Sequence, residues 1–263
     1  MAYIKEYWND KEKRAEQAKK HTKEMEQIYG ESIKETVKNT IIYDTDFKSI
    51  KTYSCETKIV VEATDSVSAV INHAKECKKR MAVLNFASYK NPGGAFINGS
   101  KAQEECLCHE SCLYNVLVEF VPTFYDWNNK NKNKALYLNR GLYSPKVVFC
   151  KDGKSVLCDV ITCASPNKSA AKRYQKVTDS ENTKVLKSRI KFVLDIAKEN
   201  DVELLILGAY GCGVFGQDAT EVAEIFKEYL ETTHNCFEKV IFAIPNGRDK
   251  NYEMFEKVFQ YCN

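Results

Sequence analysis

The feature that most constrains this chain is the alternation of short apolar runs with longer amphipathic segments. Residues 81–86, 204–207 and 240–244 are apolar runs of strand length, and segments with a helical spacing of apolar residues separate them. This pattern predicts buried strands that alternate with helices. Such an alternation builds a central sheet covered by helices on both faces. The sequence therefore predicts an α/β fold.

The remaining elements follow from the same periodicities. Further strands are expected at residues 41–43, 59–61, 146–150 and 156–164, with a turn at Asp152 and Gly153 between the last two. Helices are expected at residues 65–79 (with Asp65 as N-cap), 104–117, 178–200, 219–230 and 252–259, and residues 120–134 are expected to form an exposed loop. Residues 1–38 have helical spacing that is broken near Gly30. We predict an N-terminal helical extension over residues 1–40, packed on one domain over residues 41–263.

Two glycine-rich loops stand where such folds bind ligands. Residues 85–105, NFASYKNPGGAFINGSKAQEE, leave one predicted strand and enter a predicted helix, and residues 208–216, GAYGCGVFG, do the same. The backbone N–H groups of the second loop, with the following helix N-terminus, would form an anion nest suited to a pyrophosphate. In α/β sheets the ligand crevice lies beyond the carboxyl ends of the strands. We therefore expect both loops to face one crevice.

The second loop matches no standard nucleotide motif. No Gly-Lys-Ser/Thr follows it, so it is not a P-loop, and it comes too late in the chain for a dinucleotide-binding fingerprint. Its Phe215 could stack on a sugar or a base. The alternative is a tight turn with a phenylalanine in the core.

Glu104 and Glu105 are the candidate acid/base groups. Neighbouring residues at a helix start point about 100° apart, so one carboxylate would transfer protons while the other holds a hydroxyl. Two anions this close also raise the pKa of one of them. The alternative is that both carboxylates stabilise a helix N-terminus. Position in the sequence leaves both interpretations open.

The order of these motifs resembles a known family. Pro92-Gly93-Gly94, a short spacer and Ala102-Gln103-Glu104-Glu105 resemble the glycine run and Gln-Glu-Glu signature of poly(ADP-ribose) glycohydrolases, in their compact microbial-type branch. The resemblance extends from about residue 10 to the C-terminus. Further matching segments are Asn85-Phe86-Ala87, Asn91-Pro92, Ser111 with Leu113-Tyr114, Ala164-Ser165-Pro166-Asn167 and residues 208–215.

The resemblance implies a macrodomain fold, with a central mixed sheet between two helical layers and ADP-ribose in the crevice. It implies that Glu105 is the catalytic acid/base and that Glu104 holds ribose hydroxyls. It implies no metal and no cofactor. The substrate-binding residues that it implies are Asn85, Gly93, Gly94, Ala95, Phe96, Asn98, Gln103, Gly211, Cys212, Gly213, Val214, Phe215 and Gly216.

The chemistry implied is hydrolysis of the ribose glycosidic bond in poly- or mono-ADP-ribosylated substrates, with release of ADP-ribose. Glu105 would protonate the leaving oxygen and then deprotonate the incoming water, while an oxocarbenium-like centre develops beside the diphosphate. One alternative is a non-catalytic ADP-ribose-binding module. Another is a hydrolase of ADP-ribosylated nucleic acid or nucleotide derivatives.

Ala95 departs from the family pattern, which has a third glycine there. A methyl group at this position would forbid a positive φ or crowd the ribose or its attached chain. We therefore expect ADP-ribose to bind, and removal of a terminal or single ADP-ribose to be favoured over processing of long polymer.

Composition limits the classes of binding partner that we expect for this protein. The formal charge of +3 over 263 residues gives no electrostatic case for extended nucleic-acid contact or a membrane surface. Eleven cysteines without a secretory signal are expected to be reduced thiols in the cytoplasm. The expected partner is ADP-ribose or an ADP-ribosylated protein, and the expected state is a monomer.

The cysteines suggest two other kinds of site, a metal site and a reactive thiol. Cys106, Cys108, His109 and Cys112 have compact spacing for a metal site, although four ligands on one helix would not converge tetrahedrally. Cys212 in the anion nest is expected to gain thiolate character from nearby helix N–H groups. A nucleophilic role for it would need a neighbouring histidine.

Overall fold

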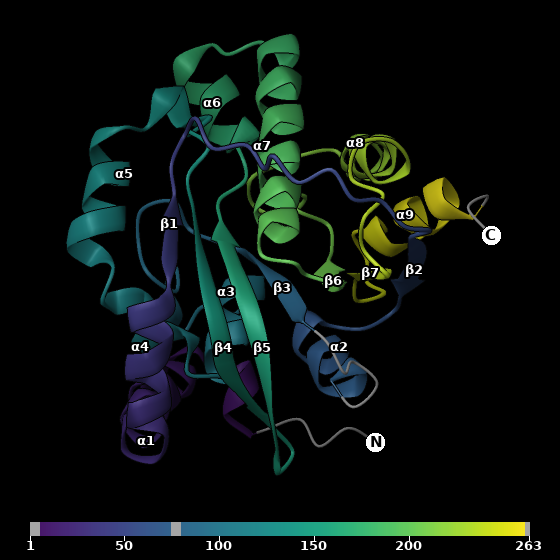
Figure 1. Ribbon diagram of the computed structural model, residues 1–263. Coiled ribbons are helices and arrows are strands. Elements are labelled where there is room, and N and C mark those ends of the chain that lie inside the picture. The colour runs from purple at the N-terminus through teal and green to yellow at the C-terminus, as the bar shows by residue number, and fades with distance from the viewer. Residues whose placement is uncertain (1–5, 75–79, 261–263) are drawn as a thin grey trace.

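The centre of the protein is a mixed sheet between two helical layers (Figure 1), in a computed structural model that describes residues 6–74 and 80–260. Within these residues the sheet has seven strands in the order β1-β4-β5-β3-β6-β7-β2. The strands are β1 Ile41–Tyr43, β2 Lys58–Glu62, β3 Met81–Phe86, β4 Gly141–Lys151, β5 Lys154–Cys163, β6 Leu204–Leu207 and β7 Lys239–Ala243. The central strand β3 pairs in parallel with β5 and β6, whereas β4 is antiparallel to β1 and β5. The predicted α/β fold is confirmed.

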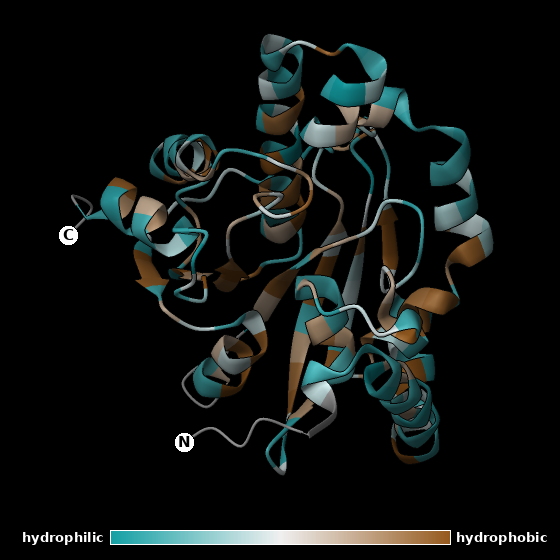
Figure 2. Ribbon diagram, turned by 180° about the vertical axis from the view of Figure 1, so that it is seen from behind, coloured by the Kyte–Doolittle hydropathy of each residue, from teal (hydrophilic) through white to brown (hydrophobic). Residues whose placement is uncertain are grey.

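The helices bury one hydrophobic core on each face of the sheet. They are α1 Lys11–Asn39, α2 Ser66–His73, α3 Gln103–His109, α4 Leu113–Val118, α5 Asp126–Lys130, α6 Lys168–Gln175, α7 Asp179–Glu199, α8 Ala219–Glu231 and α9 Asn251–Phe259. Helices α1 to α4 cover one face and α7 to α9 the other. Hydrophobic residues concentrate on the strands between the layers, and the helices alternate hydrophilic and hydrophobic residues (Figure 2). No helix in the described ranges is long and apolar enough to cross a bilayer.

Most predicted elements are present close to their expected positions. Strands β4 and β5 are longer than expected, and their hairpin turns at Asp152 and Gly153 as predicted. Asp65 caps α2 as expected, because its side chain accepts a hydrogen bond from the Ser68 N–H at 2.9 Å. The last part of the helix predicted there, residues 75–79, lies outside the described residues.

The prediction of one helix over residues 104–117 is wrong. The chain leaves helical geometry at Glu110 and resumes it at α4, three residues later. Between the two helices the backbone pairs with β4: the Cys112 N–H donates to the Val148 carbonyl, and the Cys150 N–H donates to the Glu110 carbonyl. Hydrogen bonds to a distant strand thus replace those of a continuous helix, which local periodicity could not indicate.

The prediction of a loop over residues 120–134 is also wrong. A π-helix at Val121–Tyr125 leads into α5, and a short 3-10 helix follows at Asn133–Ala135. The guanidinium of Arg140 donates to the carbonyls of Phe124 and Thr123 and lies over the Trp127 ring. The buried guanidinium of Arg140, the residue before β4, therefore stabilises the helical form of residues 121–130.

Helix α6 was not predicted at all. It begins directly after Pro166, and the side chain of its N-cap Asn167 accepts from the Ala170 N–H at 2.9 Å. Its alanines and basic residues form only a weak apolar stripe, so periodicity gave little signal.

Helix α1 lies along β4, α4 and a 3-10 helix at Phe96–Asn98. The predicted break near Gly30 is confirmed as a kink, with non-helical angles at Tyr29. The buried Arg14 connects this helix to the first glycine loop, because its Nε donates to the Gly99 carbonyl at 2.8 Å. Whether residues 1–40 form a separate unit stays a prediction.

Replacing Arg14 with alanine should lower the free energy of unfolding by about 2 kcal/mol, because the buried Gly99 carbonyl and the partly buried Trp8 carbonyl lose a charged donor. Chemical denaturation of the variant would measure this. Lys13→Ala, at an exposed neighbouring position, is the matched control. Equal stability of the two variants would contradict the role of Arg14.

Candidate active site

The two carboxylates of the Gln-Glu-Glu segment hold the first glycine loop in place. Glu104 Oε2 accepts from the Ser88 N–H at 2.7 Å, and its Oε1 accepts from Asn85 Nδ2 at 3.1 Å. Glu105 Oε1 accepts from the Ala95 N–H at 2.9 Å. Both carboxylates therefore bind groups of the preceding segment and do not cap the backbone of their own helix.

Gly94 is the point at which the two carboxylates meet. A Cβ atom built there would lie 2.6 Å from Glu105 Oε1 and 3.0 Å from Glu104 Oε2, and its φ is +61°. Only glycine adopts this positive φ readily and has no Cβ atom to collide with the two carboxylates. The side chains of Glu104 and Glu105 thus converge on one point of the loop, although they leave the helix in different directions.

The two carboxyl groups differ in their surroundings. Burial raises the pKa of Glu104 to about 8, against the opposing hydrogen bonds from Ser88 and Asn85, and the charge of Glu105 adds to the rise. Glu104 is 3% exposed and Glu105 is 6% exposed. Glu104 is therefore largely protonated at neutral pH, and the main cause is burial, not the neighbouring carboxylate on which the expectation from the sequence rested.

Ala95 fits its backbone position without strain. Its φ is −114° and its ψ is 32°, so the expectation that a methyl group would forbid the local backbone conformation is wrong. The next side chain, Phe96, is fully buried against the rings of Tyr114 and His109. Phe96 can therefore offer only its backbone to a ligand, and Asn98 is exposed beyond it.

Gln103 joins the start of α3 to the end of β3. Its Oε1 accepts from the Phe86 N–H at 2.8 Å, and its Nε2 donates to the Leu84 carbonyl at 2.8 Å. Asn85 joins Glu104 of α3 to β5, because the amide that donates to Glu104 also donates to Thr162 Oγ1 at 3.3 Å. These two predicted binding residues primarily position the strand and Glu104.

The second glycine loop presents free backbone donors. Within the described residues, the N–H groups of Gly213, Val214 and Phe215 make no hydrogen bond, whereas that of Gly216 donates to the Gly213 carbonyl. Gly211 has φ +79°, and a Cβ there would collide with the Ser165 side chain, so this turn also requires glycine. The loop can therefore offer consecutive amides to an anion.

The following helix does not contribute to this nest as expected. The side chain of Asp218 caps α8 by accepting from the Glu221 N–H at 2.9 Å, so a carboxylate already occupies that N-terminus. Burial raises the pKa of Cys212 to about 12, and the charges of Asp218 and Asp249 add to the rise. The expectation of thiolate character at Cys212 is wrong.

Phe215 belongs to an aromatic cluster at the end of this loop. It packs on Tyr89, Tyr137 and Ala164, with 6.1 Å between its ring centroid and that of Tyr137. The rings of Tyr89 and Tyr137 stack at 4.2 Å. Phe215 remains partly exposed, so its ring both packs on the core and faces a hollow.

Two neighbouring hollows lie at the carboxyl ends of the parallel strands. The loop hollow, about 300 Å³, is lined by Ala102, Ser165, Gly211 and Phe215 among others. The β7 hollow, about 310 Å³, is lined by Asp65, Val67, Ile244 and Pro245 among others. Both hollows share Phe86, Gln103 and Ala209.

These hollows bring the ends of the two glycine loops together, as the sequence predicted. The carboxylates and Gly93 to Phe96 lie beside them without lining either one. Sequence reasoning did not select Asp65, Phe86 or Ile244 as site residues. Their positions in the sequence could have indicated them, since each residue lies at or shortly after the carboxyl end of a strand.

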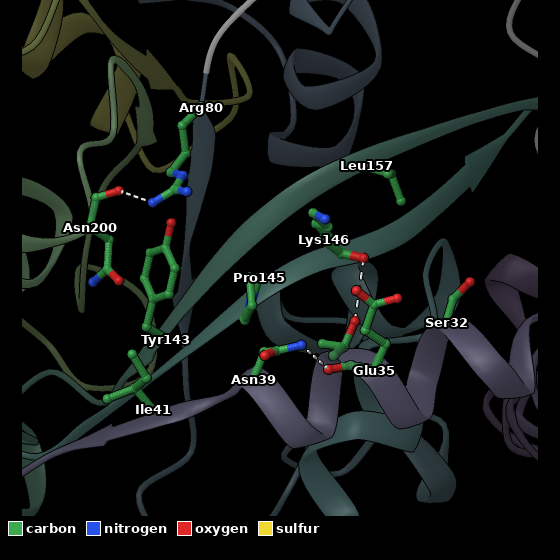
Figure 3. A pocket seen from close by; sticks show the side chains of 11 residues that line it. Ser32, Glu35, Asn39, Ile41, Arg80, Tyr143, Pro145, Lys146, Leu157 and Asn200 are labelled. Carbon is green, nitrogen blue, oxygen red and sulfur yellow. Dashed lines mark hydrogen bonds between the residues drawn. The ribbon is translucent and has the colours of Figure 1, made fainter.

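A larger hollow, about 510 Å³, lies at the opposite edge of the sheet (Figure 3). It contains none of the predicted site residues. Arg80 there donates to the Asn200 carbonyl and pairs with Asp159, and the Tyr143 hydroxyl also donates to Asp159. These polar groups lie where the pairing of β4 and β5 is irregular, between Ser144 and Val147.

The compact cysteine and histidine segment does not assemble a metal site. The break between α3 and α4 falls between His109 and Cys112, which disrupts the single helix that was expected. Across residues 6–74 and 80–260, no group of three or more His, Cys, Asp or Glu side chains is arranged to hold a metal ion.

Comparison with known proteins now identifies the family. A family model described as the catalytic domain of microbial-type PARG, that is, poly(ADP-ribose) glycohydrolase, matches residues 10–152, more than half of the chain. The chain belongs to the microbial-type poly(ADP-ribose) glycohydrolase family. It is therefore homologous to glycosidases, and the resemblance carried by the two loops is confirmed.

Solved structures of glycohydrolases share the whole fold. The enzyme from Thermomonospora curvata is 27% identical with a TM-score of 0.85, over 94% of this chain and all of that one. The same enzyme bound to the inhibitor ADP-HPD has a TM-score of 0.81 at 26% identity, over 94% and 99% of the two chains. The Deinococcus radiodurans enzyme in complex with ADP-ribose has 29% identity and a TM-score of 0.80, over 88% and 97%. A search of curated proteins finds no match.

Replacing Gly94 with alanine should destabilise the protein by at least about 1–2 kcal/mol, because the residue has a positive φ and its methyl group would displace the Glu105 carboxylate. Ala95→Gly is the matched control, since residue 95 has a φ open to either amino acid. It should cost less than about 1 kcal/mol. Thermal unfolding of both variants would measure the difference, and equal destabilisation would contradict this account of the loop.

The protonation of Glu104 predicts a pH dependence of stability. Its folded pKa of about 8 lies above the ordinary value of 4.5, so between these pH values the folded state keeps a proton that the unfolded state has lost. The free energy of unfolding should therefore fall as pH rises through this window, by at most about 1.4 kcal/mol per pH unit. Glu104→Gln should lack this contribution. A wild-type minus variant difference that stays constant from pH 5 to 8 would contradict the raised pKa.

Proposed function

We propose that this protein hydrolyses the ribose glycosidic bond of ADP-ribosylated substrates and releases ADP-ribose. The observation that carries the proposal is the pair of buried carboxylates, Glu104 and Glu105, which meet at Gly94 beside the two hollows. Membership of the glycohydrolase family supports the reaction class. The crystallised relatives that bind ADP-ribose and ADP-HPD support the ligand.

The two hollows offer complementary surroundings to the two ends of ADP-ribose. We assign the adenosine to the β7 hollow, where the side chains of Val67, Phe86 and Ile244 provide apolar walls. The diphosphate would pass over the shared floor to the loop hollow, where the amides of residues 213–215 can donate to it. The distal ribose would then lie against Phe215, at the end nearest Ser88 and the carboxylates.

Glu105 is assigned the proton transfers. It would protonate the oxygen that leaves the anomeric carbon, and then take a proton from the water that attacks the oxocarbenium-like centre. Glu104, largely protonated at neutral pH, can donate a hydrogen bond to a ribose hydroxyl. Its neutral state also keeps a negative charge from the immediate neighbourhood of Glu105.

Removal of a terminal or single ADP-ribose is the proposed specificity. The Ala95 backbone is unstrained, so the substitution leaves the loop conformation intact and ADP-ribose binding is expected to survive. The effect of the Ala95 methyl group would then be steric. It would act on whatever is attached to the ribose, because the Ala95 N–H itself contacts Glu105.

A non-catalytic ADP-ribose-binding module is the second candidate. It is favoured by one observation: both carboxylates are buried and line neither hollow. Tight calorimetric binding of ADP-ribose, with no release from polymer or from mono-ADP-ribosylated protein, would decide for this candidate.

Replacing Glu105 with glutamine should lower the rate of ADP-ribose release by about 10²–10⁴-fold, because the amide cannot exchange a proton with the leaving oxygen or the water. The dissociation constant for ADP-ribose should stay within about threefold of the wild-type value, since the amide keeps the shape of the site. Chromatography of the products and calorimetry would measure the two quantities. The matched control is Glu119→Gln, an exposed carboxylate at the end of α4. Unchanged turnover in Glu105→Gln would rule out its assignment as the acid/base.

A further inference from the structure

The loop hollow has no charged side chain among the described residues that line it. The diphosphate that we assign to it carries a negative charge on each phosphate, and the Glu105 carboxylate lies beside the hollow. Backbone amides can donate hydrogen bonds to such an anion, but each amide supplies only a partial charge. Any full positive charge that acts on the diphosphate in this hollow therefore belongs to a residue outside its lining.

Arg189, in the middle of α7, holds a positive charge directly behind this lining. Its side chain is fully buried, and its guanidinium donates to the Ala164 carbonyl. Ala164 is followed by Ser165, whose side chain lines the loop hollow and packs against Gly211. The guanidinium therefore lies behind the wall of the hollow, on the side of the second glycine loop.

The field of Arg189 reaches two sides of the loop hollow. Tyr210 belongs to the second glycine loop and lines the hollow, whereas Tyr89 and Tyr137 form the aromatic cluster on which Phe215 packs. Burial raises the pKa of all three tyrosine hydroxyls, and the positive charge of Arg189 opposes the rise in each. A charge that acts on these side chains also acts on an anion in the hollow that they adjoin.

No carboxylate balances the charge of Arg189. Its remaining hydrogen bonds are to Asn139 Oδ1, at 2.7 Å from Nε, and to the Leu136 carbonyl, at 3.5 Å from Nη2. Across the described ranges its guanidinium forms no ion pair, whereas the buried Arg140 pairs with Asp44 at 2.7 Å. A buried cation without a counter-ion is unfavourable, so binding of an anion that supplies the missing charge is favoured.

We propose that Arg189 determines specificity for a charged ligand, as the buried counter-charge of the diphosphate, without touching it. This inference rests on the proposed function and adds a residue to its binding site. The amides of residues 213–215 fix where the diphosphate lies, and Arg189 supplies the charge that favours an anion there. Because charges in a protein interior are screened less than in water, the effect passes through the wall of the hollow. The site thereby selects a nucleotide diphosphate over an uncharged nucleoside.

The experiment supplies Arg189 with the counter-ion that it lacks. Asn139→Asp replaces the amide that accepts from the guanidinium by a carboxylate of the same shape, so the hydrogen bond is kept while the charge is balanced. In calorimetry the variant should bind ADP-ribose about tenfold more weakly than the wild type, whereas the uncharged adenosine should bind with unchanged affinity. Thermal unfolding of the variant verifies that it is folded.

A second variant acts from the protein surface. Ser188 is exposed on α7, and its hydroxyl accepts from Asn139 Nδ2 at 2.8 Å. Ser188→Asp therefore places a carboxylate beyond Asn139 from the guanidinium, and it should weaken ADP-ribose binding by about threefold. Asn39→Asp, at the exposed end of α1, is the charge-matched control and should leave both affinities at their wild-type values.

The outcomes separate this inference from the proposed function. A purely structural role of Arg189 predicts wild-type affinity for ADP-ribose in Asn139→Asp and Ser188→Asp, and that result would overturn the inference even in a protein that releases ADP-ribose. Parallel losses for ADP-ribose and adenosine, or an equal loss in Asn39→Asp, would overturn it as well. A loss confined to ADP-ribose, in a protein whose wild type releases nothing from polymer or modified protein, would support the counter-charge and reject the hydrolase. A wild type that binds no ADP-ribose would overturn both.

Discussion

The hydrogen bonds from the Ser88 and Ala95 amides to Glu104 and Glu105 are the contacts on which the site depends. They tie residues 88–95 to the first turn of α3 and draw both carboxylates onto Gly94. The same loop continues to Gly99, whose carbonyl accepts from Arg14 of α1. A single stretch of loop therefore connects the acidic pair to the N-terminal helix, so packing of α1 and geometry of the carboxylates are coupled.

This arrangement requires that one of the two carboxyl groups is protonated and shielded from water. Burial keeps Glu104 largely neutral at pH 7, whereas an ionised pair at this separation would repel. The Ser88 N–H that binds Glu104 is held close to the sheet, because Ser88 stands two residues after β3 and Gln103 binds the end of β3. The rigid strand thus supports groups whose burial would otherwise destabilise the fold.

Sheet topology decides which loops meet. The central strand β3 has β5 and β6 as parallel neighbours, so the segments that follow these three strands emerge at one edge. There Ser165 after β5 packs on Gly211 after β6, and Ala102 and Gln103 line the same hollow as Phe215. Periodicity predicted the strands and their buried character, but it carried no information on strand order, which depends on pairing between distant residues.

The sequence by itself determined the alternating α/β class, the two glycine loops and the identity of the acidic pair, because these features depend on local spacing and on a short motif. Only the tertiary structure decided that the acids bind loop amides, that Asp218 occupies the α8 N-terminus, and that α3 and α4 separate. It also decided that Ala95 is unstrained. The physical reason is common to all of these: each is set by hydrogen bonds, charges or packing between residues far apart in the sequence, which no local pattern records.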